Sequence, residues 1–159
     1  MVGALPSSKV REQLVGLVGS VVGDQRVIDQ LDVDASVPLA QSMAVRLAAP
    51  VLFQTDRAAV RREHTANIRR CASILAKVPG STVIITGHTD SRGSDAYNDV
   101  LGLARAQAVQ QVLVAQGVKP SRVQAVSAGR RQPVEDNATL AGRRRNRRVE
   151  LVFADLLGP

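Results

Sequence analysis

The chain has 159 residues, of which 45% are hydrophobic and 22% charged, and its formal net charge at pH 7 is +7. These values are typical of one soluble globular domain with a smaller appendage. No stretch approaches the roughly 18 uninterrupted apolar residues of a membrane-spanning helix, and the N-terminus lacks the pattern of a signal peptide. We therefore expect a chain that acts where it is made or that is a piece of an exported protein.

The positive charge raises the question of nucleic-acid binding. Much of it lies in the segment GRRRNRR (142–148) and in Arg130 and Arg131. Aromatic residues make up only 2% of the chain, and no zinc-ligand or base-stacking pattern accompanies the arginines. The composition therefore argues against nucleic acid as the partner, and a basic face is equally suited to acidic polymers of the cell envelope.

The apolar periodicity alternates between strand and helix along the chain. A strand ends near Phe53, and the longest helix is capped by Ser94 or Asp95 and stopped by Gly117. Cys71 falls on the apolar face of a helix, which indicates a buried, unreactive thiol. We expect an α/β (α+β) fold with the order β-α-β-α-β-β, a mixed sheet with helices packed on one face, from the segments 45–56, 61–78, 81–87, 94–117, 122–129 and 147–153.

Two opposite charges stand out in GHTDSRGSDAYNDVLGLARAQAV (87–109). Asp90 follows the end of a central strand, where open α/β sheets place their ligands. Arg105 shares a helix face with Asn98 and Leu101. A carboxylate beside a guanidinium suits a ligand that carries both charges. The two residues could equally form a structural ion pair with each other, and the spacing alone leaves both readings open.

Catalysis and metal binding have weaker support. His88 has no serine or cysteine partner in a recognisable motif, and the chain has only two histidines, too few for a typical zinc site. Nothing around Asp56 and Asp90 suggests the raised pKa that a glycosidase acid needs. We take His88 as a polar loop residue and expect a binding module with no enzymatic activity, no metal and no cofactor.

Four segments resemble the OmpA-like C-terminal domain, a peptidoglycan-binding module also found in Pal lipoproteins and MotB stator proteins. They are VLFQTDRAAV, VIITGHTDSRGSDAYNDVLGLARAQAV, VQAVSAGRRQPV and GRRRNRRVELVF, and we place the domain at residues 45–156. The resemblance implies that Asp90 and Arg105 bind the diaminopimelate residue of the stem peptide. In this interpretation the chain anchors an envelope protein to the cell wall, from the periplasm or another wall-facing location. The rival interpretation is a domain of the same fold that binds a protein instead.

The expected peptidoglycan-binding set combines the two charges with their neighbours. Arg147 shares its strand parity with Val149, Leu151 and Phe153 and is our choice for a second carboxylate contact. Arg143, Arg144 and Arg145 are taken as a solvated face. We expect substitutions of Asp90 or Arg105 to abolish binding with little effect on stability. The full set is Asp90, Arg105, Thr89, Asn98, Leu101, Arg147, Phe53 and Thr55.

Two positions depart from the family pattern. Gln54 stands where an aspartate is usual. A ligand contact through a side chain next to Phe53 therefore has less support than a contact through backbone groups there. Gly102 replaces the usual serine of the helix, at a cost of about 0.5–1 kcal/mol of helix propensity, and leaves space for a ligand or another segment.

Residues 1–36 loosely resemble part of a BON domain, with Val15, Val18 and Val22 on one helical stripe, and residues 37–44 read as a linker. Such a half-domain would expose its apolar face, so it packs on the main domain, pairs with a partner, or belongs to a longer protein whose other half is missing.

Overall fold

The computed structural model describes residues 31–33, 45–47 and 50–154. Within this part of the chain, no helix is both long and apolar enough to cross a membrane. The elements follow one another as β1 (Leu31–Val33), β2 (Val45–Leu47), β3 (Val51–Leu52), α3 (Arg62–Lys77), β4 (Thr82–His88), α4 (Asp95–Ala115), the 3₁₀ turn η1 (Pro120–Arg122), β5 (Val123–Gly129), α5 (Leu140–Asn146) and β6 (Arg148–Ala154).

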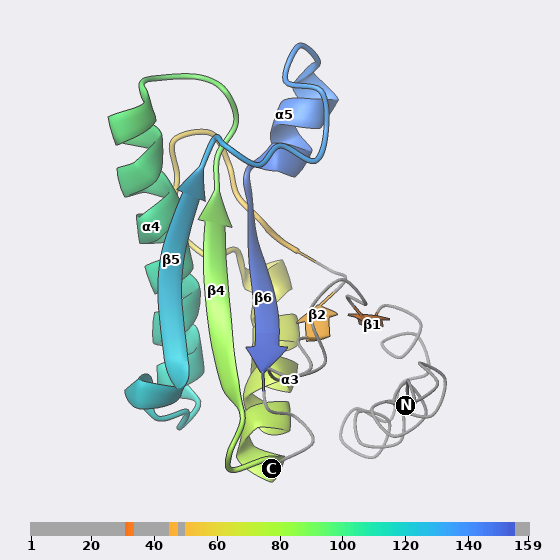
Figure 1. Ribbon diagram of the computed structural model, residues 1–159, viewed down its shortest axis with the longest axis vertical. Coiled ribbons are helices and arrows are strands. Elements are labelled where there is room, and N and C mark those ends of the chain that lie inside the picture. Colours follow the sequence, from red (N-terminus) through yellow and green to blue (C-terminus); the bar gives the residue numbers. More distant parts are fainter. Residues whose placement is uncertain (1–30, 34–44, 48–49, 155–159) are drawn as a thin grey trace, which may run out of the picture.

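One mixed sheet organises the domain, with the strand order β1-β2-β6-β4-β5 and with β3 also paired to β6. β4 and β5 run parallel and are joined by the crossover helix α4, whereas β6 is antiparallel to β4. Helices α3 and α4 lie on one face of this sheet, behind it in Figure 1, while α5 lies beyond its end. The predicted mixed sheet with helices on one face is therefore confirmed.

The core lies between this sheet and the two helices. Inward-facing residues of β4 and β6 alternate with more exposed ones, as the period of a strand requires. Cys71 of α3 is 1% exposed, and burial raises the pKa of its thiol to about 12. The prediction of a buried, unreactive cysteine is thus confirmed. The largest fully buried apolar side chains are Phe153, Ile68, Leu75, Ile85, Leu113 and Leu151.

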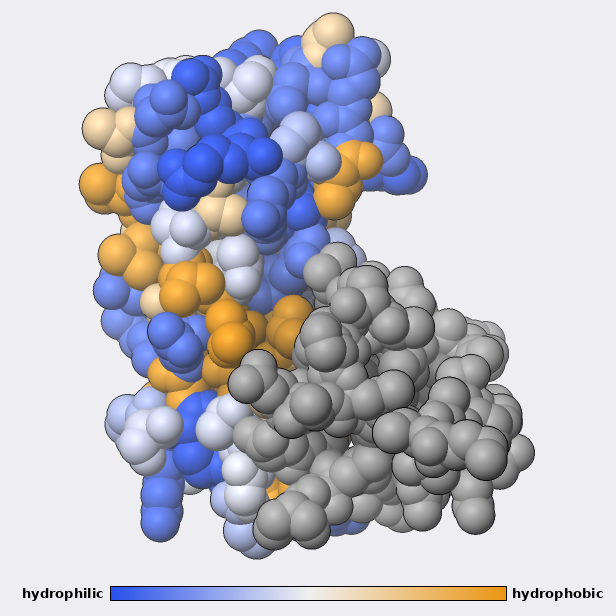
Figure 2. Space-filling view, viewed as in Figure 1, coloured by the Kyte–Doolittle hydropathy of each residue, from blue (hydrophilic) through white to orange (hydrophobic). Residues whose placement is uncertain are grey.

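Among the described residues, no helix covers the opposite face of the sheet. Figure 2 views this face and shows hydrophobic residues over its middle and mostly hydrophilic ones at the upper end, where α5 lies in Figure 1. Ile84, at the centre of β4, is 39% exposed there. On the face shown in Figure 2, hydrophilic residues therefore surround the end of the sheet at which β4 and β5 finish.

Two glycines bring α4 unusually close to the sheet. A Cβ atom on Gly87 of β4 would collide with the backbone of Gly102 in α4. A Cβ atom on Gly102 would in turn collide with the Ser127 side chain and lie 2.8 Å from the carbonyl oxygen of Gly87. The space expected at Gly102 is thus filled by strands of the same domain, and the glycine serves helix–sheet packing.

The elements expected from the sequence differ from the observed ones at two places: one helix was missed, and one expected strand is divided into two. Residues 140–146, which belong to none of the elements expected from the sequence, form α5, whose first turn is capped by the Thr139 hydroxyl accepting from the Gly142 amide at 2.9 Å. The strand expected in 45–56 consists of two short strands, β2 and β3. Leu31–Val33 pairs with β2. The rest of the expected BON-like segment and the linker at 37–44 lie outside the described residues.

Candidate binding site at the end of strand β4

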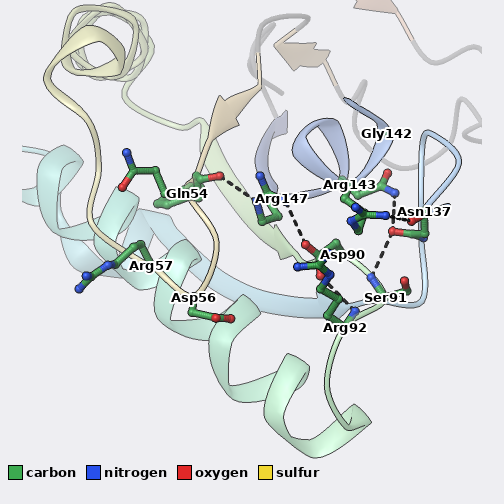
Figure 3. A network of polar contacts seen from close by, with 12 residues as sticks. Gln54, Asp56, Arg57, Asp90, Ser91, Arg92, Asn137, Gly142, Arg143 and Arg147 are labelled. Atoms are coloured by element: carbon green, nitrogen blue, oxygen red, sulfur yellow. Dashed lines mark hydrogen bonds and ion pairs between the residues drawn. The ribbon is translucent and has the colours of Figure 1, made fainter. Parts of the chain in front are cut away.

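Asp90 lies two residues beyond the end of β4 and is 5% exposed. Its Oδ2 atom pairs with Nη1 of Arg147 at 3.0 Å, and its Oδ1 atom accepts from the Arg92 amide at 3.1 Å. The close view in Figure 3 shows Arg147, just before the start of the neighbouring strand β6, reaching this carboxylate. Asp90 therefore lies at the end of the central strand, as its place in the sequence predicts, and is in addition buried and paired with Arg147.

Arg105 lies on α4 and is completely buried. It donates to three backbone carbonyls: Nε to Arg57 at 2.9 Å, Nη1 to His88 at 2.9 Å and Nη2 to Gln54 at 3.1 Å. Its direct partners are thus carbonyl oxygens, and the structural ion pair with Asp90 that the sequence left open does not form. The guanidinium ties the loop after β3 to the end of β4.

The surroundings of Arg105 leave its charge incompletely compensated. Burial, and next the repulsion from Arg147, lower the pKa of Arg105 to about 10, although Asp90 and Asp56 act in the opposite direction. Its guanidinium carbon also lies 5.4 Å from the centroid of the Phe53 ring, a cation–π contact. Arg105 is therefore a cation held in the protein interior without a carboxylate of its own.

Arg147 is 8% exposed and lies between α5 and β6. Its backbone carbonyl accepts from the Phe53 amide at 2.9 Å, and its Nε donates to the Phe53 carbonyl at 3.2 Å. Val149 and Leu151 of the same parity are also buried, as predicted. Arg148 pairs with Glu150 at 2.7 Å. Strand parity thus correctly separates the arginine beside Asp90 from its neighbour.

Thr89 and Asn98 are both buried near Asp90 but have different surroundings. The Thr89 amide donates to the Gly129 carbonyl at 2.9 Å, while its Oγ1 atom is buried with no hydrogen-bond partner. Asn98 donates from Nδ2 to the carbonyls of Arg92 at 2.9 Å and Ser94 at 3.0 Å. Asn98 therefore holds the loop after Asp90, and the Thr89 hydroxyl has no hydrogen-bond partner within the described part of the chain.

Three other residues of the predicted set surround the cluster less closely. Phe53 is 2% exposed and belongs to the core, where its ring contacts Arg105. Leu101 is half-buried on α4, and Thr55 is exposed in the turn after β3. Gln54 contributes its backbone carbonyl to Arg105, so the departure from the family pattern at this position leaves that contact unchanged.

The structure corrects two expectations. His88, expected as a polar loop residue, is the last residue of β4 and is 1% exposed, with Nε2 4.0 Å from Glu150 Oε2. The strand continues past Gly87 through a register shift, which places this histidine inside the fold. Arg143 is not part of a solvated face, because its Nη1 donates to the carbonyls of Asn137 at 2.7 Å and Ala138 at 2.8 Å.

A second polar centre, which sequence reasoning missed, supports the loop that carries Asp90. Asn146 is completely buried, accepts from the Val134 and Glu135 amides, and donates to Asn137 Oδ1 at 2.9 Å. The same Oδ1 atom accepts from the Ser91 amide at 3.1 Å, a contact visible in Figure 3. The loop before α5 is thereby joined to the residue that follows Asp90. The Thr139 cap was the available sequence signal for this arrangement.

Comparison with known proteins identifies the family of this domain. A model of the OmpA family matches residues 52–147. The chain therefore belongs to the OmpA family, and the resemblance seen in its sequence is confirmed. No group of three or more histidine, cysteine, aspartate or glutamate side chains suited to a metal ion occurs among the described residues.

The relatives are proteins of bacterial cell envelopes by name. The chain is 47% identical over 113 residues to outer membrane porin F of Pseudomonas fluorescens, covering 71% of this chain and 34% of the porin. It is 29% identical over 163 residues to the peptidoglycan-binding protein ArfA of Mycobacterium tuberculosis, covering 96% of this chain and 50% of ArfA. It thus spans about a third to a half of these relatives.

A solved structure gives the same fold. The crystal structure of the peptidoglycan-associated lipoprotein from Burkholderia pseudomallei superposes with a TM-score of 0.64 at 34% sequence identity. The match covers 76% of this chain and 96% of the lipoprotein structure. The mixed sheet with its helices on one face is therefore the architecture of this lipoprotein as well.

Proposed function

We propose that this domain binds peptidoglycan through the diaminopimelate residue of the stem peptide, without catalysing a reaction, and so holds an envelope protein to the cell wall. The names of ArfA and of the Burkholderia lipoprotein support peptidoglycan as the partner. The names of the lipoprotein and the porin support a location in the cell envelope. The choice of diaminopimelate rests on the charges of the site.

The imbalance of buried charge is the observation that carries the proposal. Arg105 and Arg147 are both at least nine-tenths buried. Asp90 pairs with Arg147, whereas Arg105 donates to backbone carbonyls. A buried charge without a partner is costly. A ligand carboxylate would supply the missing negative charge. Burial, and next the repulsion from Arg147, also lower the pKa of Arg105.

The free end of meso-diaminopimelate carries both an ammonium and a carboxylate. A carboxylate placed against the guanidinium of Arg147 would leave Asp90 free to accept from the ammonium, so that ligand and protein exchange ion-pair partners. Arg105 uses one N–H on each of its three nitrogens for carbonyls, and Nη1 and Nη2 each carry a second N–H for the ligand carboxylate. The unused hydroxyl of Thr89 adds a further polar contact.

Calorimetric titration of the chain with three muropeptides tests the proposal. A lysine-type stem peptide has the ammonium without the carboxylate, so we expect it to bind more weakly than the diaminopimelate form by about 2–5 kcal/mol, or roughly 30-fold to several thousand-fold. An amidated diaminopimelate keeps one acceptor oxygen and should lose less. Comparable affinity for the lysine and diaminopimelate forms would overturn the two-charge mechanism.

The rival function is a protein-interaction domain in which the charged residues serve the fold alone. The three carbonyl partners of Arg105 are the observation in its favour, because they satisfy that side chain within the domain. Absence of binding to all three muropeptides and to purified sacculi would favour this rival.

A further inference from the structure

Tyr97 is an exposed aromatic side chain beside the Asp90 site. The chain contains two phenylalanines, one tyrosine and no tryptophan. Phe53 and Phe153 are 2% and 1% exposed in the core, whereas Tyr97 is 46% exposed near the start of α4. Tyr97 is therefore the aromatic side chain that a ligand at the surface of the described domain could reach.

The ring is held from two sides. Its hydroxyl donates to Asp56 Oδ1 at 3.1 Å, and this hydrogen bond is the main cause that raises the pKa of Tyr97. On the other side the ring lies against the backbone of Gly93, where a Cβ atom would be 2.9 Å from Tyr97 Cδ1. The positive φ of Gly93, 88°, favours glycine at this place. Tyr97 is therefore a partly immobilised ring, which reduces the entropy lost when a ligand packs on it.

Asp56, the partner of Tyr97, is also unusual. It is exposed and has a φ of 52°, the one non-glycine residue with a positive φ among the described residues. Residues in this region of backbone space persist where the surrounding structure holds them, and they gather at ligand sites. Here the neighbouring carbonyls of Gln54 and Arg57 are both bound by Arg105. Figure 3 shows Asp56 on the same loop as these two residues, where that loop faces α4.

Tyr97 and Asp56 thus connect the two loops that border the proposed ligand. Tyr97 touches the loop 91–94, in which the Arg92 amide contacts Asp90, and through Asp56 it touches the loop bound by Arg105. A ligand anchored at Asp90 would have its continuation close to this ring. In peptidoglycan the diaminopimelate residue is separated from the glycan strand by two residues and a lactyl ether, and two residues span roughly 7 Å.

We infer that Tyr97 and Asp56 form a second contact, for a sugar ring of the glycan strand that carries the stem peptide. This inference rests on the proposed binding of peptidoglycan. The C–H face of a sugar packs on an aromatic face, and its hydroxyls donate to a carboxylate. Asp56 has acceptor capacity beyond the bond from Tyr97, since a carboxylate offers about four lone-pair sites. An exposed ring beside an exposed carboxylate matches this amphipathic chemistry.

The experiment compares two ligands with the same peptide. One is the tripeptide that ends in meso-diaminopimelate, and the other is that tripeptide attached to the disaccharide of N-acetylglucosamine and N-acetylmuramic acid. Calorimetry of the full 159-residue chain should give an affinity about three- to tenfold higher for the disaccharide form. Tyr97→Ala should remove this difference while leaving the affinity for the free tripeptide unchanged.

Two further variants sharpen the result. Tyr97→Trp retains a ring and should keep most of the difference between the ligands. Leu140→Ala removes a side chain that is 73% exposed on α5 and should change neither affinity, which makes it the matched control. Thermal unfolding of each variant reports whether the fold is retained.

The outcomes separate this inference from the proposal on which it rests. Equal affinity of the unaltered chain for both ligands would overturn the sugar contact and leave the diaminopimelate site standing. Equal losses for both ligands in Tyr97→Ala would show that the ring supports the loops and would also overturn the sugar contact. Binding of neither ligand to the unaltered chain would overturn both proposals.

Discussion

Arg105 and Arg122 perform the same structural task at opposite ends of β4. Arg105 joins the loop after β3 to the carbonyl of His88, the last residue of the strand. Arg122, in η1, donates to the carbonyls of Leu75, Val78 and Ser81 at 2.7–2.8 Å and so joins the end of α3 to the residue before the strand. Each guanidinium donates hydrogen bonds to several backbone carbonyls that would otherwise lack a donor.

The difference between the two arginines lies in what surrounds them. The hydrogen bonds of Arg122 go to three carbonyls and the hydroxyl of Ser81. Around Arg105 there are also a second guanidinium, a buried carboxylate and a hydroxyl without a partner, from Arg147, Asp90 and Thr89. Binding to backbone carbonyls is therefore common to both arginines, and the charges and the unpartnered hydroxyl beside Arg105 are what support the proposed ligand site there.

Removal of the Asp90 carboxylate should have the largest effect on both stability and binding. We expect Asp90→Ala to lower the free energy of unfolding by about 3–5 kcal/mol, because it leaves Arg147 buried without its ion-pair partner. The sequence alone led us to expect nearly unchanged stability, and the burial of Asp90 and its ion pair with Arg147 are the reason for the larger effect now expected. The variant should also fail to sediment with purified sacculi. Urea unfolding and cosedimentation measure the two effects.

Glu63→Ala is the control for Asp90→Ala, since it removes a carboxylate from an exposed ion pair with Arg61. It should leave both unfolding and sedimentation close to those of the unaltered chain. A folded Asp90→Ala protein that sediments as the unaltered chain does would place the binding site elsewhere.

A matched pair of lysine substitutions tests whether the two arginines differ as described. Lysine keeps the charge, but its single ammonium cannot reach three carbonyls in different directions. Arg105→Lys and Arg122→Lys should each lower the free energy of unfolding by about 2–4 kcal/mol. Only Arg105→Lys should weaken binding of the diaminopimelate muropeptide in calorimetry. Equal loss of affinity in both variants would mean that binding follows stability alone.

Thr89→Val separates binding from stability in the other direction. Valine has nearly the shape of threonine but no hydroxyl, so the unpartnered buried Oγ1 atom disappears. We expect the free energy of unfolding to rise by up to about 1 kcal/mol, and the affinity for the muropeptide to fall by about 0.5–1.5 kcal/mol. Unchanged affinity, measured by the same titration, would exclude the hydroxyl from the ligand contacts.

The exposed arginines of α5 should have the smallest effect. Arg144 is exposed, and Arg145, with a 70% exposed side chain, pairs with Glu135. Replacement of both by glutamine, with Arg143 kept to hold the Asn137 carbonyl, should reduce only the part of sacculus binding that salt suppresses. Sedimentation at low and high salt checks this. A loss of the same size at both salt concentrations would contradict it.

The sequence predicted those elements whose own residues determine them. The β-branched run of β4 and the Ser94 cap with Gly117 at the far end of α4 are local patterns, and the structure confirms both elements. Strand parity also separated Arg147, which pairs with Asp90, from Arg148, which pairs with Glu150, although both arginines are buried. Helix α5 was missed because LAGRRRN has too few apolar residues for a helical period, which leaves the Thr139 cap as its signal.

The partners within the site were less predictable. The acceptors of Arg105 are carbonyls of Gln54, Arg57 and His88, and every residue type carries such a carbonyl. No residue pattern distinguishes them before the fold is known. The same holds for Asn146, whose contacts with the loop before α5 depend on the position of a helix that the sequence did not reveal.

The contact between Gly87 and Gly102 sets the geometry of the site from a distance. Asp90 and Arg105 each follow one of these glycines by three residues. The contact between α4 and β4 therefore fixes the positions of both charged residues relative to each other. A side chain at either glycine would lift the helix from the sheet. The Cα atom of Arg105, about 4.5 Å further along the helix axis than that of Gly102, would then move with the helix and carry the guanidinium away from the His88 carbonyl.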